Sequence, residues 1–157
     1  MTLPDGAGAT TQIDHLLLSP YGIFVIETKN YKGWIFASAR QKQWTQKIYK
    51  NSYTFQNPIH QNYKHIKVLE QLLTDIVEPD LLHSVIVFMP DAVFKTPMPN
   101  EVFRGAAWTD YVKSFDQQMI SETKLKRIQL RLEKELLEKS WKTNRKHVES
   151  LKQHKQP

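Results

Sequence analysis

One hairpin decides the fold of this 157-residue chain. It reads Ile13-Asp14-His15-Leu16-Leu17-Leu18-Ser19-Pro20-Tyr21-Gly22-Ile23-Phe24-Val25-Ile26-Glu27-Thr28-Lys29. Two apolar runs flank a Pro/Gly turn, which is a strong signal for an antiparallel β-hairpin. If the turn centres on Pro20 and Tyr21, residues pair when their numbers add to 41, so Asp14 lies across from Glu27. Lys29 then projects from the same face as Glu27, because side chains alternate along a strand.

Two opposed carboxylates repel each other unless a cation holds them together. Asp14 and Glu27 therefore predict a divalent metal site with Lys29 beside it. Their hard oxygen atoms suit Mg²⁺ or Mn²⁺, and the backbone carbonyl of Thr28 offers a third ligand. A metal there would activate a water that Lys29 could orient or deprotonate, which is half of a phosphodiesterase site. The alternative is a surface ion pair at a strand end, and a one-residue slip in the turn would break the register.

The composition is that of one globular domain, with 40% hydrophobic and 24% charged residues. The chain contains no cysteine, which excludes disulfides and thiolate zinc sites. No apolar run approaches the roughly 20 residues that span a bilayer. Residues 1–6 lack the basic-then-apolar pattern of a signal peptide. These features predict a cytoplasmic protein with no membrane segment.

The net charge of +6 is unevenly distributed. Residues 1–118 hold 11 Lys/Arg and 11 Asp/Glu, whereas residues 119–157 hold 11 Lys/Arg and 5 Asp/Glu. A basic arm on a neutral domain indicates a polyanionic partner, most simply nucleic acid, and its candidate contacts are Lys124, Arg127 and Arg131. The alternative is a solvated charged helix that aids solubility.

Aromatic and basic residues also alternate along two segments, 31–34 and 42–53. Such segments can bind a nucleic-acid strand by stacking and charge, and Lys32, Lys47 and Lys50 are the candidate contacts. The alternative is a half-buried hairpin with ordinary alternation.

The remaining pattern predicts an α/β fold with a mixed sheet. Asn57 and Pro58 begin a helix, with Asn as N-cap and Pro at the first helical position. Domain boundaries are expected at residues 1–118 and at 119–157, a basic helical extension. The other expected elements are strands at 34–37, 44–49, 84–89 and 102–108, a loop at 91–100, a short helix capped by Thr109 and ending at Phe115, and a long helix from Ser121.

Several separated motifs resemble the nuclease-related domain family of the PD-(D/E)XK restriction-endonuclease-like superfamily. They are Ile13-Asp14-His15, the run from Gly22 to Gly33, and Asn57-Pro58 with Gln61, and they cover about residues 3–90. The resemblance implies a restriction-endonuclease-like mixed β-sheet flanked by helices. It also implies that Asp14 and Glu27 bind the metal, that Lys29 is the catalytic lysine, and that Gln61 is an accessory polar residue. Trp44 matches a recurrent family position and is expected to pack in the core.

The chain departs from the family pattern at its start. Family members usually begin with a helix carrying a Gly-Glu motif and a strand that leads into the region of Leu3. Without that helix we expect an exposed sheet edge and apolar face, which a second copy in a homodimer, or another chain, would cover.

The resulting hypothesis is a bacterial, Mg²⁺-dependent nuclease that hydrolyses DNA phosphodiester bonds. His65 lies four residues after Gln61 on the same helix face, so we expect it to support the site or contact a phosphate. No histidine metal site is predicted. The alternative is a catalytically inactive module that keeps the nuclease fold for DNA or protein binding and oligomerisation.

Overall fold

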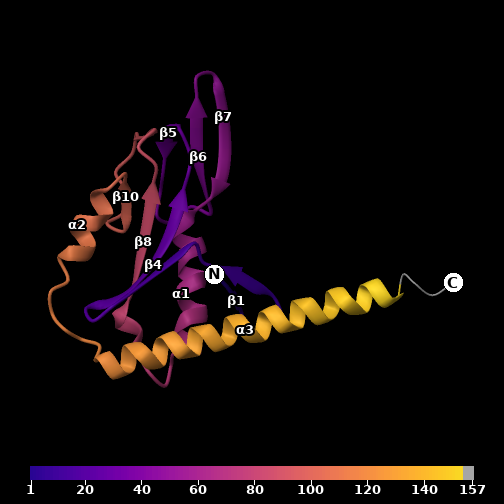
Figure 1. Cartoon of the computed structure of the whole chain (residues 1–157). Helices are drawn as coiled ribbons and strands as arrows, with labels where there is room; N and C mark the ends of the chain where they lie inside the picture. The colour runs from indigo at the N-terminus through magenta and orange to yellow at the C-terminus, as the bar shows by residue number, and fades with distance from the viewer. Residues whose placement is uncertain (154–157) are drawn as a thin grey trace.

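A four-stranded mixed sheet forms the centre of the molecule (Figure 1). The computed structural model describes residues 1–153, except for the side chains of residues 143, 144 and 146–153. The strand order is β10-β8-β4-β3, in which β4 and β8 are parallel, as are β8 and β10, while β3 and β4 are antiparallel. The bounds are β3 His15–Ser19, β4 Gly22–Lys29, β8 Leu82–Phe88 and β10 Val102–Arg104.

The β3–β4 hairpin has the predicted register. His15 pairs with Ile26 and Ser19 pairs with Gly22, so paired residues add to 41 and the turn consists of Pro20 and Tyr21. The Ser19 hydroxyl closes the turn by donating to the carbonyl of Gly22 and accepting from its N–H. This local chemistry fixes which side chains of β4 share a face.

Helices cover both faces of the central sheet. On one face, α1 (Pro58–Leu72) and the start of α3 (Glu122–Gln153) pack with the small hairpin of β1 (Thr2–Pro4) and β2 (Thr10–Gln12). On the other, α2 (Ala107–Lys113) covers Phe24, Ile26, Val85 and Val87. As predicted, Asn57 is the N-cap of α1, where its side chain accepts from the N–H of Ile59.

A second four-stranded sheet extends from the first (Figure 1). Its order is β7-β6-β5-β9, where the first three strands form an antiparallel meander and β9 joins in parallel. Its inner face packs Ile35, Trp44 and Phe55 against Phe88 of the central sheet, which confirms Trp44 as a core residue. The bounds are β5 Gly33–Phe36, β6 Gln43–Ile48, β7 Asn51–Gln56 and β9 Ala92–Phe94, and a short 3-10 turn covers Pro79–Leu81.

Several expected boundaries were wrong. Thr109 is not the N-cap of α2: Ala106 is, and the Thr109 hydroxyl donates to its carbonyl inside the first turn. The strand expected at 102–108 stops at Arg104, because Gly105 takes a positive φ of 59°. The loop expected at 91–100 contains β9, β7 was not predicted, and the single expected mixed sheet is divided into separate sheets.

The long helix α3 is packed against the body at its beginning and projects past it at its end (Figure 1). Ser121 caps it as predicted, accepting from the N–H of Lys124. Ile120, Ile128 and Leu132 are buried in the same cluster as Leu3 and Ile13. At these residues, α3 therefore covers the apolar face that we expected to be exposed.

Candidate functional site

The end of β4 brings a carboxylate, an ammonium and an amide together. Glu27 and Lys29 project from one face of the strand, and Nζ of Lys29 lies 2.8 Å from Oε1 of Glu27. The same ammonium donates to Oε1 of Gln61 at 2.8 Å. Gln61 stands in the first turn of α1, which the Asn57 cap places over this part of the sheet. The three residues that the sequence singled out thus meet at one point.

Asp14 reaches the same strand end from the neighbouring chain segment. It lies between β2 and β3, and its Oδ2 accepts a hydrogen bond of 3.0 Å from the backbone N–H of Thr28. Asp14 stands one position beyond the last backbone pair of the hairpin, His15 with Ile26, and its side chain bonds to the residue that follows Glu27. Asp14 is exposed, so its other oxygen atom is open to solvent and to a ligand.

Buried polar side chains of α1 lie next to Glu27. The Nδ2 of Asn62 donates to the carbonyl of Val25 at 2.9 Å and to Oγ of Ser84 at 2.8 Å. Its Oδ1, which can only accept, lies 3.3 Å from Nδ1 of His65, so that nitrogen carries the proton. His65 Nδ1 is also 3.6 Å from Oε2 of Glu27. His65 is therefore a buried neighbour of Glu27 rather than a surface phosphate contact.

One oxygen atom of Glu27 is left without a partner. Glu27 is only 3% exposed, and its Oε2 has no hydrogen bond among the residues that the structure describes. A buried carboxylate oxygen is normally satisfied, because an unpaired one costs free energy. Such an oxygen beside a solvent-facing carboxylate is the arrangement expected of a metal ligand.

Burial and charge set the protonation of the site. Burial raises the pKa of Glu27, and Lys29 opposes this by hydrogen bonding and charge, whereas Asp14 adds to it. Burial lowers the pKa of His65, which keeps its imidazole neutral at pH 7. The centre thus combines the carboxyl group of Glu27, whose pKa is raised, with the neutral imidazole of His65 and the ammonium of Lys29.

The residues present fit a small, hard divalent cation. Asp14, Glu27 and the carbonyl of Thr28 are oxygen donors, and Mg²⁺ keeps several waters in such sites. Among the side chains that the structure describes, no group of three or more Asp, Glu or His residues gathers to hold an ion. The expected donor set of two carboxylates with a backbone oxygen stays a prediction, and the rest of any coordination shell would be water and substrate.

The predicted nucleic-acid contacts lie on two separate parts of the molecule. Lys32, Lys47 and Lys50 are exposed on the second sheet. Lys124, Arg127 and Arg131 lie on α3, at the opposite end of the molecule in Figure 1. The structure does not bring the two groups together.

The cations of α3 have structural partners. Arg131 makes two hydrogen bonds to Asp75, at 2.8 and 2.9 Å, and one to the carbonyl of Leu72 at the end of α1. Arg127 lies 3.9 Å from the same Asp75 carboxylate. Arg131 therefore fastens α3 to α1, whatever else it contacts.

The sequence did not single out Asn62 and Ser84, which hold the site together. A signal for Asn62 existed in the spacing of α1. Its buried stripe consists of Pro58, Asn62, His65 and Leu69, so two polar residues occupy positions that face the core. Buried polar side chains at such positions need partners, which here are Val25 and Ser84.

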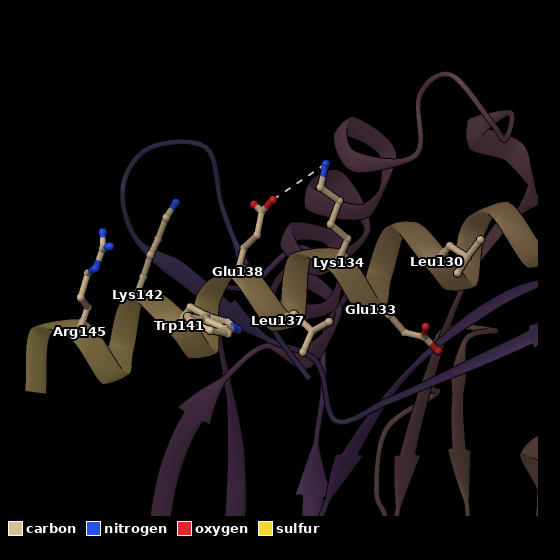
Figure 2. A pocket seen from close by; sticks show the side chains of 8 residues that line it. All are labelled: Leu130, Glu133, Lys134, Leu137, Glu138, Trp141, Lys142 and Arg145. Atoms are coloured by element: carbon tan, nitrogen blue, oxygen red, sulfur yellow. Dashed lines mark ion pairs between the residues drawn. The ribbon is translucent and has the colours of Figure 1, made fainter.

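A groove lies away from this centre. It follows the outer side of α3, and Figure 2 shows the side chains of Leu137 and Trp141 lining it, which are 61% and 77% exposed. Glu138 and Lys134 form a loose ion pair of 3.9 Å beside them. None of the residues that line the groove belongs to the cluster of Asp14, Glu27, Lys29 and Gln61.

A mixed α/β domain with a carboxylate and a lysine at the end of a central strand agrees with the restriction-endonuclease-like class. The family model for the nuclease-related domain matches residues 1–89, more than half of the chain, and the chain belongs to this family. The match covers Asp14, Glu27, Lys29 and Gln61.

The comparisons add one relative and no solved structure. An uncharacterized protein of Bacillus anthracis is 56% identical over 66 residues, which is 42% of this chain and 31% of that protein. The chain thus matches less than a third of that relative's length. No solved structure matches this chain. Among the described residues, no helix is both long and apolar enough to cross a bilayer, and a cytoplasmic location stays a prediction.

Proposed function

We propose that this protein is a Mg²⁺- or Mn²⁺-dependent nuclease that hydrolyses DNA phosphodiester bonds. The observation that carries the proposal is the unpartnered Oε2 of buried Glu27, 3% exposed, in a site that also holds Lys29. Membership of the nuclease-related domain family supports the substrate class. The free-energy cost of burying an unpaired carboxylate oxygen is tolerated where a functional ligand offsets it.

The metal would be held by Asp14, by Glu27 and by the carbonyl of Thr28. When bound, it would lower the pKa of a coordinated water and offset the charge that develops on the phosphate. The hydrogen bond from the Thr28 N–H orients the Asp14 carboxylate before any ligand arrives. This preorganisation reduces what binding must spend on ordering side chains.

Lys29 is the candidate catalytic residue. Its ammonium is held between Glu27 and Gln61, at 2.8 Å from each, so its position is fixed by two acceptors. From there it can orient the attacking water and stabilise negative charge on the phosphate. Gln61 keeps Lys29 in place by accepting this hydrogen bond.

The test is cleavage of supercoiled plasmid and of labelled single strands with Mg²⁺, Mn²⁺ or EDTA. Wild type is compared with Glu27→Gln and Lys29→Ala, and each variant is checked for folding by circular dichroism. Metal-dependent cutting that both variants lose supports the proposal. A folded wild type that cuts neither substrate in either metal overturns it.

The second candidate is a non-catalytic binding module with the nuclease fold. It is favoured by the Lys29–Glu27 ion pair, which neutralises the buried carboxylate without a metal. Metal binding separates the two functions, because a catalyst should bind Mn²⁺ and lose it on Asp14→Asn, whereas a binding module need not.

We also propose a homodimer. We place its interface on the outer side of α3 and not on the apolar face that was expected from the sequence (Figure 2). Leu130, Leu137 and Trp141 are 65%, 61% and 77% exposed and follow one helix face. In an antiparallel pair centred on Leu137, facing residues add to 274, so Glu133 of one copy lies opposite Trp141 of the other, next to Lys142. Light scattering after size exclusion tests this: a dimer that Leu137→Glu converts to a monomer supports it, and a monomeric wild type at micromolar concentration contradicts it.

A further inference from the structure

The second sheet carries a charge of a single sign. The 28 residues from Asn30 to Asn57 contain five Lys or Arg and no Asp or Glu. They form β5, β6 and β7, which stand out from the body in Figure 1. Over residues 1–118 as a whole the charges cancel, so this local excess is hidden in the overall balance. A surface with cations and no carboxylate attracts polyanions.

Exposed aromatic side chains lie among these cations, and two of them border a cavity. Trp34 of β5 is 46% exposed and Tyr49, in the turn between β6 and β7, is 95% exposed. With Lys32 and Lys47 they line a cavity of about 410 Å³. The ammonium of Lys95 lies 4.4 Å from the centre of the Trp34 ring, which adds a further cation next to this ring. Aromatic faces between cations are the parts of a base-stacking site.

Packing does not account for Tyr49. Its backbone has φ of 54°, a conformation that Gly or Asn adopts more easily than a bulky aromatic residue. It is the one non-glycine residue with positive φ in the part of the chain that the structure describes. Its ring is almost fully exposed, so no buried contact offsets the strain. Strain of this kind persists at binding sites.

Gly33 sets the position of Trp34 at the edge of this cavity. Its φ is 84°, and a Cβ there would lie 2.6 Å from the carbonyl oxygen of Lys47. Only glycine lets β5 begin this close to β6, and the next residue, Trp34, then pairs with Lys47. The ring and the ammonium therefore project from the same face of the sheet.

We propose that this cavity, lined by Lys32, Trp34, Lys47 and Tyr49, stacks an unpaired base of a single-stranded nucleic acid. The lysines would contact the flanking phosphates. The inference rests on the proposed function, because it supplies the substrate strand that the metal centre would cut. Trp34 is five residues beyond Lys29, a span of at most about 17 Å, or about five nucleotides at a stacked rise of about 3.4 Å.

The experiment compares bases with phosphates alone. Fluorescein-labelled 20-mers, one of thymidine and one fully abasic, are titrated with wild type, Trp34→Ala and Tyr49→Asn in EDTA, so that nothing is cut. Asparagine removes the ring and still tolerates the positive φ of position 49. Tyr21→Ala is the matched control, because Tyr21 is an exposed aromatic in the turn of the other hairpin. All four proteins are checked for folding by thermal melting.

The expected result is specific to the bases. Wild type binds the thymidine strand more tightly than the abasic strand. Trp34→Ala and Tyr49→Asn each weaken thymidine binding about tenfold and leave abasic binding unchanged. Tyr21→Ala binds both strands as wild type does. Lys47→Gln gives a second readout, because losing one phosphate contact lowers the slope of log affinity against log salt by about 0.7.

Two outcomes overturn the inference: equal binding of both strands by wild type, or unchanged binding by both aromatic variants. Either would make the exposed rings a site for another partner, such as a protein. The experiment also distinguishes failure of the proposed nuclease from failure of this inference. Base-specific binding without any metal-dependent cutting would contradict the nuclease and support the stacking site. Cutting that is unaffected in the aromatic variants, with unchanged binding, keeps the enzyme and removes the stacking site.

Discussion

The ammonium of Lys29 lies 2.8 Å from Oε1 of Glu27, two residues back on the same strand. This contact lowers the pKa of a carboxyl group that burial otherwise raises. The lysine therefore favours the ionised form of Glu27, which is the form that a metal ligand requires.

Lys29→Met should move the pH dependence of metal binding. Metal competes with a proton for Glu27, so binding is lost as pH falls through the pKa of this group. Without Lys29 that pKa rises further, and the midpoint of Mn²⁺ binding shifts to higher pH. Calorimetric titration between pH 5 and 8 measures the shift, and an unchanged midpoint would contradict this account of the pair. Cleavage should fall by about 10²–10⁴-fold, the usual contribution of a positioned acid or base.

Asp14→Asn and Glu27→Gln should each remove most of the metal affinity. We expect losses at least as large as the roughly 10–100-fold that follows from removing an outer partner of a metal ligand. Mn²⁺ titration followed by electron paramagnetic resonance measures this directly, with no need for a substrate. Asp5→Asn serves as the control, because Asp5 binds only backbone N–H groups of its own loop. Retained Mn²⁺ affinity in both site variants would exclude these carboxylates as ligands.

Asn62→Leu should destabilise the fold and loosen the site. The substitution keeps the number and branching of the side-chain heavy atoms but leaves the carbonyl of Val25 and the hydroxyl of Ser84 without the Asn62 donor. Buried unsatisfied groups of this kind cost about 1–3 kcal/mol in the free energy of unfolding. Urea denaturation measures the loss, with the exposed neighbour Lys64→Ala as a control expected within about 0.5 kcal/mol. A stability equal to wild type would show that water replaces the amide.

The features predicted correctly are those with a local cause. The Ser-Pro-Tyr-Gly turn fixes the register of β3 and β4, and the Asn57 side chain begins α1. The strands β7 and β9 lack such a signal. β9 has three residues, and what makes it a strand is its pairing with β5, which lies far earlier in the sequence. Short strands stabilised by distant neighbours do not show in a local pattern.

The same division holds in the candidate site. Glu27 and Lys29 meet because a strand alternates, and Gln61 was placed by resemblance to the family. The support beneath them could not be predicted, because Ser84 contacts Asn62 from a strand 22 residues later. Nor does the sequence show that the basic helix α3 is also part of the core, since that depends on which of its residues meet Leu3 and Ile13.

The last prediction concerns α3 and the boundary expected at residue 118. Ile128 is fully buried, so Ile128→Ala should cost about 2–5 kcal/mol in the free energy of unfolding. Lys126→Ala, on the exposed side of the same helix and outside the proposed dimer interface, should change it by less than about 0.5 kcal/mol. Urea denaturation distinguishes a helix that belongs to the core from a separate arm, because an arm would tolerate both substitutions equally. Deleting residues 119–157 to test DNA binding would then unfold the domain, so charge-changing substitutions at Lys124 and Lys126, which leave the buried face intact, are the appropriate variants.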